Sequence, residues 1–464
     1  MGESEAKMTF VGTDPYIPPA PTVYDKELPL WKLLMNMRQS TLSVWIDDAF
    51  DKLVWRPRTI GNETVVINDP DGVRHVMTTN ADNYRRPFLV QRTIRPLIGD
   101  GLFLAKGADW RRQRRLLAPQ FTPSSISLIL PHFQAAGLDL LRTIEGSAQV
   151  NLSQAFQDTA LEAVLRALFS MPQNEARAKL SALARRYIDG PGRPTLFDSI
   201  ARSETAFGFV NSARIRFQRT WFAAIDQVVR DRQEASAPGG GARDLLDLLL
   251  AIRDTDSGEA LPMAEVRDQC STMLLAGSET TARLMFWSSY LLAQVPEEQA
   301  RVRAEIANFP ADQVTSLDDL RNWPRLRNVL LEAMRLYPPV PHTVRDAIGP
   351  DHICGEPVKA NGRVWMSAWV MHRHRRFWEH PTAFMPDRFD GVSAPWVQMP
   401  AYVPFGVGPR ICLGLTFALA EAQIILAQLL SRYGLSLVEG PPVMPIAHLT
   451  IEPSYEPQFR LHLD

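Results

Sequence analysis

The chain has 464 residues, 45% of them hydrophobic and 22% charged, a composition that supplies a large buried core and is typical of globular proteins. Its 50 Lys and Arg against 51 Asp and Glu give a formal charge of −1, which excludes a strong overall field for nucleic acid or anionic lipid. The three cysteines, Cys270, Cys354 and Cys412, form no CxxC pair, which argues against a disulfide framework and a structural zinc site.

The opening residues of the chain carry charges where a signal peptide needs an apolar core. No uninterrupted apolar run reaches the roughly 18 residues that a membrane-spanning helix needs. The sparse cysteines fit a reducing compartment. We therefore expect a cytoplasmic protein with no membrane partner and no nucleic-acid partner.

The predicted elements begin with an N-terminal arm over residues 1–25, because the proline-rich run at 14–21 cannot form a regular helix. A β-branched run at 64–68 predicts a strand, and the turn residues after it lead into a helix. From about 108 to 430 the pattern is mainly helical. Short strands are expected near the C-terminus, at 435–440, 449–453 and 459–463.

The segment 405–414 reads FGVGPRICLG and is followed by a long apolar run that predicts a helix ending at Gly434. Cys412 therefore lies at a junction between a loop and a helix, where the helix dipole and unpaired N–H groups favour a thiolate. Cys270 and Cys354 have no glycine-rich or basic surroundings, so we expect both to be small buried hydrophobic residues.

Glycines allow the backbone of this segment to turn tightly and to approach a flat ligand; they are Gly406, Gly408 and Gly414. Arg410, two residues before the thiol, can reach an anionic group at the edge of such a ligand.

The segment resembles the cysteine loop of the cytochrome P-450 family, FxxGxRxCxG, at each defined position: Phe405, Gly408, Arg410, Cys412 and Gly414. The resemblance implies a mainly α-helical fold with small β-sheets, in which a triangular helical body encloses haem b, iron protoporphyrin IX. It also implies that Cys412 is the axial iron ligand and that Phe405, Arg410 and Gly414 contact the cofactor. Residues 1–464 are expected to form a single haem-containing domain without a fused reductase.

Two further motifs of the family match in order. Glu332 and Arg335 lie three residues apart and thus on one helix face, where they can form an ion pair. The family completes this pair with an arginine from a PxRF segment, which here is Arg388. The resemblance therefore implies a structural triad of the three residues, in which the loss of one buried charge would be costly.

The helix predicted after Gly107 carries Trp110 and Arg114 one turn apart, and both side chains are donors suited to a carboxylate. The resemblance implies that these two residues, together with Arg345, contact the haem propionates. The remaining arginines of this helix are expected to dock an acidic electron carrier, with an exposed basic face that binds nothing as the alternative: Arg111, Arg112 and Arg115.

Within a helix predicted over about 264–295, the sequence LLAGSETTA places polar residues in an apolar stretch, a local inconsistency that often marks a functional site. The segment resembles the oxygen-binding motif of the family. The resemblance implies that Ala276 or Gly277 leaves room for dioxygen, that Thr280 holds a hydrogen bond to it and that Glu279 relays protons inward. Thr281 is expected to have a packing role.

These motifs together predict a haem-thiolate monooxygenase that inserts one atom of dioxygen into a mostly apolar small molecule. The chain shows no flavin, dinucleotide or iron–sulfur signature, so electrons are expected from a separate ferredoxin or flavodoxin with its reductase, and the enzyme is expected to be a monomer. A non-catalytic haem-thiolate sensor and a peroxide-driven or isomerising member of the family are the alternatives. The acid and threonine of the oxygen motif favour the enzyme.

The resemblance also implies which segments line the substrate pocket: the loop 84–104, the region 197–217, the turn 340–344 and the hairpin near Leu449. Arginines in the first segment either anchor a substrate carboxylate or are plain surface residues; they are Arg85, Arg86, Arg92 and Arg95.

Overall fold

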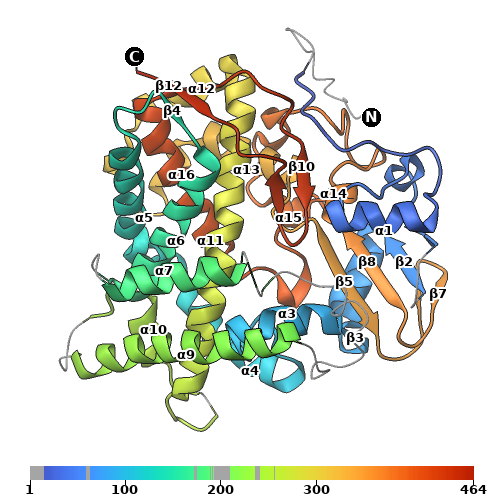
Figure 1. The fold of residues 1–464 in the computed structure, drawn as a ribbon, viewed down its shortest axis with the longest axis horizontal. Coiled ribbons are helices and arrows are strands. Elements are labelled where there is room, and N and C mark those ends of the chain that lie inside the picture. Colours follow the sequence, from blue (N-terminus) through green and yellow to red (C-terminus); the bar gives the residue numbers. More distant parts are fainter. Residues whose placement is uncertain are drawn as a thin grey trace, which may run out of the picture.

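The computed structural model describes residues 15–58, 63–171, 175–188, 190, 192, 209–235, 241–254 and 256–463. Figure 1 shows most of the helices gathered into one body, with the largest sheet at its side. The mainly helical fold with small sheets that the sequence predicts is therefore confirmed.

The α-helices are α1 (Leu30–Gln39), α2 (Pro70–Arg74), α3 (Phe88–Ile98), α4 (Gly107–Leu117), α5 (Pro123–Ile144), α6 (Leu152–Phe169), α7 (Glu175–Ile188), α9 (Phe209–Ala235), α10 (Leu245–Ala251), α11 (Met263–Gln294), α12 (Pro296–Asn308), α13 (Pro324–Leu336), α14 (Ala368–Met371), α15 (Pro395–Gln398) and α16 (Leu415–Arg432). Short helical turns are η1 (Asp47–Phe50), η2 (His75–Thr79), η3 (Ala81–Asn83), η4 (Ala118–Phe121), η5 (Ala311–Gln313), η6 (Asp319–Asn322), η7 (Pro386–Phe389) and η8 (Gly408–Arg410).

Helix α11 is the axis of the helical body, and it packs against α3, α6, α9, α13 and α16 (Figure 1). Its second half is buried almost all round, as expected of a helix inside a large core. The helix ends at Gln294 because Pro296, two residues later, cannot continue the hydrogen-bond ladder and instead opens α12. The predicted helix at about 264–295 is confirmed to within one residue at each end.

Within the described ranges the strands form four small sheets. They are β1 (Val54–Trp55), β2 (Thr64–Ile67), β3 (Tyr84–Arg85), β4 (Gln149–Val150), β5 (His342–Ala347), β6 (Asp351–Ile353), β7 (Glu356–Val358), β8 (Arg363–Ser367), β9 (Gly434–Leu437), β10 (Pro445–Ala447), β11 (Ile451–Pro453) and β12 (Phe459–His462). The largest sheet has the order β1-β2-β8-β5-β3, with β2 and β8 parallel and the other neighbours antiparallel.

Several expectations about local structure are correct. Strand β2 occupies the predicted β-branched run, and α2 follows it after Asp69, whose side chain accepts hydrogen bonds from the N–H groups of Asp71 and Gly72. Strands β11 and β12 lie within two of the predicted C-terminal segments, and β9 overlaps the third but begins one residue before it.

Other expectations are incomplete or wrong. The region 108–430 is mainly helical as expected, but its pattern does not reveal β4 to β8, which are only two to six residues long and too short for a clear period. Helix α16 ends at Arg432, and Gly434 begins β9 without a left-handed conformation. The stretch 84–104, expected to be a loop, contains β3 and α3.

The cysteines away from the loop differ from each other. Cys270 is fully buried in α11, as expected. Cys354 is exposed, which contradicts the expected burial, because it occupies the turn between β6 and β7 with a φ of +50°.

Two histidines, the fully buried His372 and the half-buried His342, hold distant segments together as neutral rings. His372, just after α14, donates from Nδ1 to the Arg335 carbonyl at 3.2 Å and accepts at Nε2 from the Val403 N–H at 2.8 Å. Burial, together with the charges of Arg335 and Arg373, lowers the pKa of His372 to about 3. Burial also lowers the pKa of His342 in β5 to about 3.

We expect the apparent free energy of unfolding to fall by about 2 kcal/mol for each of these histidines between pH 7.5 and pH 5.0. The unfolded chain takes up a proton at each ring near pH 6.5, whereas the folded chain does so only near pH 3, so acid favours unfolding. Urea unfolding at both pH values measures the effect.

His342→Gln and His372→Gln should each reduce this acid-dependent loss, and the change of the exposed His352 to Gln serves as the control. An equal loss in the wild type and in all three variants would contradict the assignment.

Candidate active site

The cysteine loop, residues 405–414, folds back on itself before α16. The Cys412 N–H donates to the Phe405 carbonyl at 2.9 Å, and the turn η8 lies between these two residues. Gly406 and Gly408 have φ values of +73° and +70°, in the left-handed region that favours glycine. The sequence thus places the thiol at the start of α16, as the loop motif predicts.

Protein contacts constrain the loop glycines differently. A Cβ at Gly408 would lie 2.0 Å from Thr78 Oγ1 in η2, so that turn buttresses the loop. At Gly414, the residue before α16, a Cβ would lie 4.0 Å from the Cys412 sulfur, an ordinary contact. The surrounding protein therefore does not require glycine at 414, and the missing side chain leaves the space beside the sulfur open.

Cys412 is exposed, in contrast to the fully buried Cys270. Surrounding protein atoms nonetheless displace enough water to raise the pKa of its thiol. The Gly414 backbone and the positive charge of Arg114 act in the opposite direction and favour the thiolate.

Helix α4 braces the cysteine loop through the two residues that the sequence singles out. Arg114 Nη1 donates to the Ile411 carbonyl at 2.9 Å, and the Arg410 guanidinium lies 4.2 Å from the centre of the Trp110 ring. Arg410 also donates to the Ala105 carbonyl, with both Nη atoms at 3.2 Å. Trp110 and Arg114 therefore contact the cysteine loop directly.

Three half-buried guanidinium groups, those of Arg86, Arg345 and Arg410, form what we call the guanidinium cluster. Burial and the charges of the other two lower the pKa of Arg86 well below its usual range. The pKa of Arg345 falls to about 10 through burial and the Arg410 charge, and burial lowers that of Arg410 to about 10. The Arg86 guanidinium lies 4.5 Å from the centre of the Phe103 ring.

The guanidinium cluster has no counter-charge in direct contact: within the described ranges, none of its members forms an ion pair with a carboxylate. Half-buried cations that repel one another are stabilised by an anion placed between them. Two carboxylates at the edge of a flat ligand would supply that charge, while the open Cys412 sulfur would bind a metal at its centre. The residues present therefore fit haem b.

On α11, Thr280 and Ala276 are one turn apart on the same face. The Thr280 hydroxyl donates to the Ala276 carbonyl at 2.6 Å, and Ala276 is exposed. Ser278 lies on the buried side and donates to the Leu274 carbonyl at 2.7 Å. The polar interruption thus has one accessible hydroxyl, that of Thr280, and two buried hydroxyls, those of Ser278 and Thr281.

Gly277 has a different role from the one that the motif suggests. A Cβ at this position would lie 2.9 Å from Val164 Cγ2 of α6. Glycine is therefore needed for the close approach of α6 to α11. Of the two small residues considered from the sequence, only Ala276 presents an open face.

Glu279 is paired with a residue that sequence reasoning missed. Its Oε1 accepts from Arg283 Nε at 2.8 Å and from the Thr450 hydroxyl at 3.3 Å. Arg283 also contacts Glu452 of β11, with Nη2 3.2 Å from Oε2. The spacing of four between Glu279 and Arg283 is the signal that could have identified the pair.

The structure brings the predicted triad together. Arg335 makes a bidentate contact with Glu332, both bonds at 2.7 Å, and both side chains are fully buried. Arg388 Nε lies 3.4 Å from Glu332 Oε1. The remaining donors of Arg335 bind the carbonyls of His372, Pro381 and Ala383, so the buried charges are fully paired.

The arginines expected to dock a carrier are partly used within the chain. Arg112 binds Asp254 and Glu265, at 3.0 and 2.5 Å, and so ties α4 to the start of α11. Arg115 pairs with Asp256, but about half of its side chain stays exposed. Arg111 is also mostly exposed, with a loose contact to Asp82 at 3.6 Å.

The expected substrate segments are only partly described, because residues 193–208 lie outside the described ranges. In the others, large apolar side chains are exposed: Phe103 before α4, Val340 before β5 and Leu449 between β10 and β11. Of the arginines in 84–104, Arg86 belongs to the guanidinium cluster and Arg95 pairs with Asp100 at 2.7 Å. Arg86 is therefore not a plain surface residue, whereas Arg95 is exposed and forms a surface ion pair.

The chain matches the family model described as cytochrome P450 over residues 26–459. It is 30% identical over 358 residues to cyclooctat-9-en-7-ol 5-monooxygenase of Streptomyces melanosporofaciens, covering 75% of each chain. A cytokinin hydroxylase of Arabidopsis thaliana is 29% identical over 389 residues, covering 80% of this chain and 73% of the relative.

Among solved structures, the haem domain of cytochrome P450DA aligns with a TM-score of 0.77 at 23% identity, covering 97% of this chain and 98% of that one. A cyanobacterial CYP120A1 with bound retinoic acid aligns with a TM-score of 0.76 at 21% identity, covering 97% and 100%. Among the described residues, no helix is both long and apolar enough to cross a membrane. The chain belongs to the cytochrome P450 family, and it is an oxygen-incorporating oxidoreductase whose cofactor is haem b.

Proposed function

We propose that this enzyme inserts one atom of dioxygen into a small, mostly apolar substrate, with electrons from a separate ferredoxin or flavodoxin and its reductase. The observation that supports it most is the meeting of the open Cys412 sulfur and the guanidinium cluster at one loop. A sulfur ligand for iron and cations for two propionates are what a haem-thiolate site requires.

Each residue has a specific role in this proposal. Cys412 binds the iron, the guanidinium cluster binds the propionates, and Trp110 and Arg114 hold the cysteine loop in place from α4. Haem with a thiolate ligand supplies the electron density that favours cleavage of the O–O bond. Phe405 and Gly414 border the cofactor at the two ends of the loop.

The polar part of α11 moves protons. The hydrogen bond from Thr280 Oγ1 to the Ala276 carbonyl fixes the hydroxyl on the open face of the helix. From there the hydroxyl can pass a proton to dioxygen as it is reduced, and Glu279, the preceding residue, supplies that proton. Glu332, Arg335 and Arg388 form a scaffold and take no part in the chemistry.

An apolar substrate is supported by the exposed side chains of Phe103, Val340 and Leu449 in three segments expected to border the pocket. The relative named cyclooctat-9-en-7-ol 5-monooxygenase is consistent with this class. We further propose one haem-containing domain over 1–464, acting as a monomer in the cytoplasm, in keeping with three cysteines and a net charge of −1.

We expect Cys412→Ala to abolish the red-shifted Soret band of the reduced carbon monoxide complex, because a thiolate ligand is needed for that band. Cys270→Ala and Cys354→Ala are the controls and should retain the band. The absorption spectrum decides, and a Cys412→Ala protein with the band intact would exclude this cysteine as the iron ligand.

Thr280→Ala should retain haem and substrate binding but lower the product formed per electron to less than about half, with hydrogen peroxide taking up the difference. The reason is that protons no longer reach dioxygen from a fixed hydroxyl. Product, peroxide and cofactor oxidation are measured together with one reductase. The neighbouring change Thr281→Ala, on the buried side of α11, is the control. Full coupling in Thr280→Ala would mean that protons take another route or that the oxidant is peroxide.

Arg111 and Arg115 are the exposed arginines of α4 that can meet an acidic carrier, whereas Arg112 is already paired. Changing both to Gln should raise the apparent KM for the carrier about two- to fivefold, more at low ionic strength, without changing substrate affinity. Stopped-flow reduction measures this. Unchanged reduction kinetics would place the carrier on another surface.

A further inference from the structure

The hairpin of β10 and β11 carries Leu449 in the turn between its strands, and its position depends on other parts of the chain. Among the described residues the two strands pair only with each other, with three residues in each strand. A two-stranded hairpin of this kind is at best marginally stable on its own. The place of its tip in the molecule is therefore set by the segments that it contacts.

The residue pair next to the tip, Ala447 and Ile451, binds neighbouring segments through its backbone. On one strand, the Ala447 N–H donates to Ser40 Oγ at 3.0 Å, and the Ala447 carbonyl accepts from the Thr41 N–H at 2.9 Å. On the other strand, the Ile451 N–H donates to the Pro339 carbonyl at 3.2 Å. Both strands are thus anchored at the base of the tip.

The Ile451 carbonyl is held by Trp287, a fully buried residue of α11. The Nε1–H of Trp287 donates to this carbonyl at 3.1 Å, while its ring stacks on Tyr337, with ring centres 4.0 Å apart and planes at 14°. Tyr337 lies two residues before Pro339, whose carbonyl binds Ile451 from the other side. One indole therefore connects α11, the hairpin and the segment before β5.

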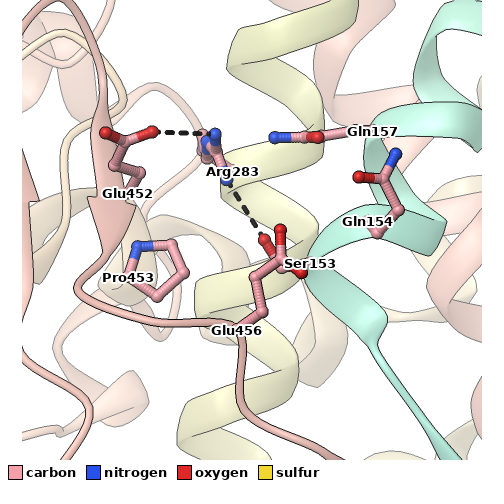
Figure 2. A pocket seen from close by; sticks show the side chains of 7 residues that line it. All are labelled: Ser153, Gln154, Gln157, Arg283, Glu452, Pro453 and Glu456. Atoms are coloured by element: carbon pink, nitrogen blue, oxygen red, sulfur yellow. Dashed lines mark hydrogen bonds and ion pairs between the residues drawn. The ribbon is translucent and has the colours of Figure 1, made fainter.

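Two further contacts join α11 to the hairpin. They are Glu279 with Thr450 at 3.3 Å and Arg283 with Glu452 at 3.2 Å. Figure 2 shows the second contact beside a polar cavity of about 280 Å³. Water in such a cavity screens the ion pair and weakens it. The hydrogen bond of Trp287 is shielded from water, so it is the stronger link.

The segments that meet at Ile451 carry exposed apolar side chains. Leu449 lies two residues before Ile451, and Val340 directly follows Pro339. On α11, Thr280 lies seven residues before Trp287, which is about two turns of helix. A shift of the Ile451 peptide would therefore move Leu449 and Val340 relative to Thr280.

We propose that Trp287 is a positioning residue that determines specificity: through the Ile451 carbonyl it fixes Leu449 and Val340 relative to Thr280. The inference rests on the proposed function, in which these two side chains border an apolar pocket, and it adds a residue that lies outside that pocket. An elongated apolar substrate whose far end contacts Leu449 is then held at one depth, with one of its carbons beside Thr280. Without the hydrogen bond the tip moves, and the substrate takes several depths.

The test compares two ligands of the ferric haem-bound enzyme, imidazole and 1-octylimidazole, through the shift of the Soret band on titration. A nitrogen of each ligand binds the iron, but only the octyl chain reaches the pocket walls. Trp287→Phe retains an aromatic ring against Tyr337 and loses the N–H group. It should raise the Kd of 1-octylimidazole about three- to tenfold and change the Kd of imidazole less than about twofold, with the carbon monoxide band intact.

Trp323 provides a matched control, because it is also fully buried and its Nε1–H donates to a carbonyl, that of Phe309, at 2.9 Å. This bond joins the end of α12 to the start of α13 instead of two segments of the pocket. Trp323→Phe should lower the thermal stability of the enzyme as Trp287→Phe does, but it should change neither Kd.

A double variant tests whether Trp287 acts through the hairpin tip. Leu449→Ala should raise the Kd of 1-octylimidazole, and this rise should be smaller in the Trp287→Phe background, because the tip is no longer held against the octyl chain. If Trp287→Phe does not retain haem, Glu452→Gln weakens the other link and should raise the same Kd about twofold. Glu456→Gln is its control, since Glu456 lines the same cavity but bonds to Asn151.

An unchanged Kd of 1-octylimidazole in Trp287→Phe would overturn the inference, as would an equal rise in Trp323→Phe or additive effects in the double variant. The Cys412 and Thr280 variants would then still decide the proposed function by themselves. A wild-type enzyme that binds 1-octylimidazole no more tightly than imidazole would contradict the apolar pocket of the proposed function, and the inference would fall with it.

Discussion

Positive charge that no carboxylate among the described residues neutralises is the constraint on which this structure depends. The guanidinium cluster is half-buried beside the cysteine loop, and the repulsion among its members has to be opposed by the fold. Strand β5 carries Arg345, and the pairing of β3 with β5 places Arg86, the residue after β3, beside it. The cysteine loop carries Arg410. Helix α4 holds this loop, because its Arg114 binds the Ile411 carbonyl and its Trp110 packs against Arg410. The elements around the site therefore hold cations in place for an anionic ligand.

The pairing of each arginine separates scaffold from site. Arg335 is fully buried and has a partner for each of its donors, Glu332 and three carbonyls, so its charge is compensated within the protein. Arg345 and Arg410 have carbonyl partners but, in the part of the chain that the structure describes, no carboxylate partner. Arg283 lies between these cases, because it is paired with two carboxylates and faces a polar cavity. The partners of each arginine thus show whether its charge is compensated within the protein, is left for a ligand or lies between these two cases.

Much of the fold follows from local sequence. The length of α11 and the position of Cys412 before α16 could be predicted, since apolar period, proline and glycine act over a few residues. Strands β5 to β8 could not, because they are short and stabilised by partners distant in the chain, as in the pairing of β2 with β8. The exposure of Cys354 depends on the short hairpin of β6 and β7, whose turn it occupies.

The motifs likewise predict the thiol, the triad and Thr280 as site residues, but not the residues that complete their surroundings. Gly277 matches the oxygen motif, yet its neighbour Val164 on α6 shows a packing role. Arg86 was one of four arginines in a predicted loop, and its place in the cluster depends on a strand pairing that the sequence does not reveal. The sequence around Arg112 is typical of a docking residue, but the fold places its partners Asp254 and Glu265, far along the chain, beside it.

The most direct test of the central claim is a crystal structure of the haem-bound enzyme, in which the contacts of the propionates are measured. The account predicts iron bound to the Cys412 sulfur and both propionates within hydrogen-bond distance of the guanidinium cluster. Propionates bound by other residues, with Arg86, Arg345 and Arg410 neutralised by protein carboxylates or turned to solvent, would contradict it.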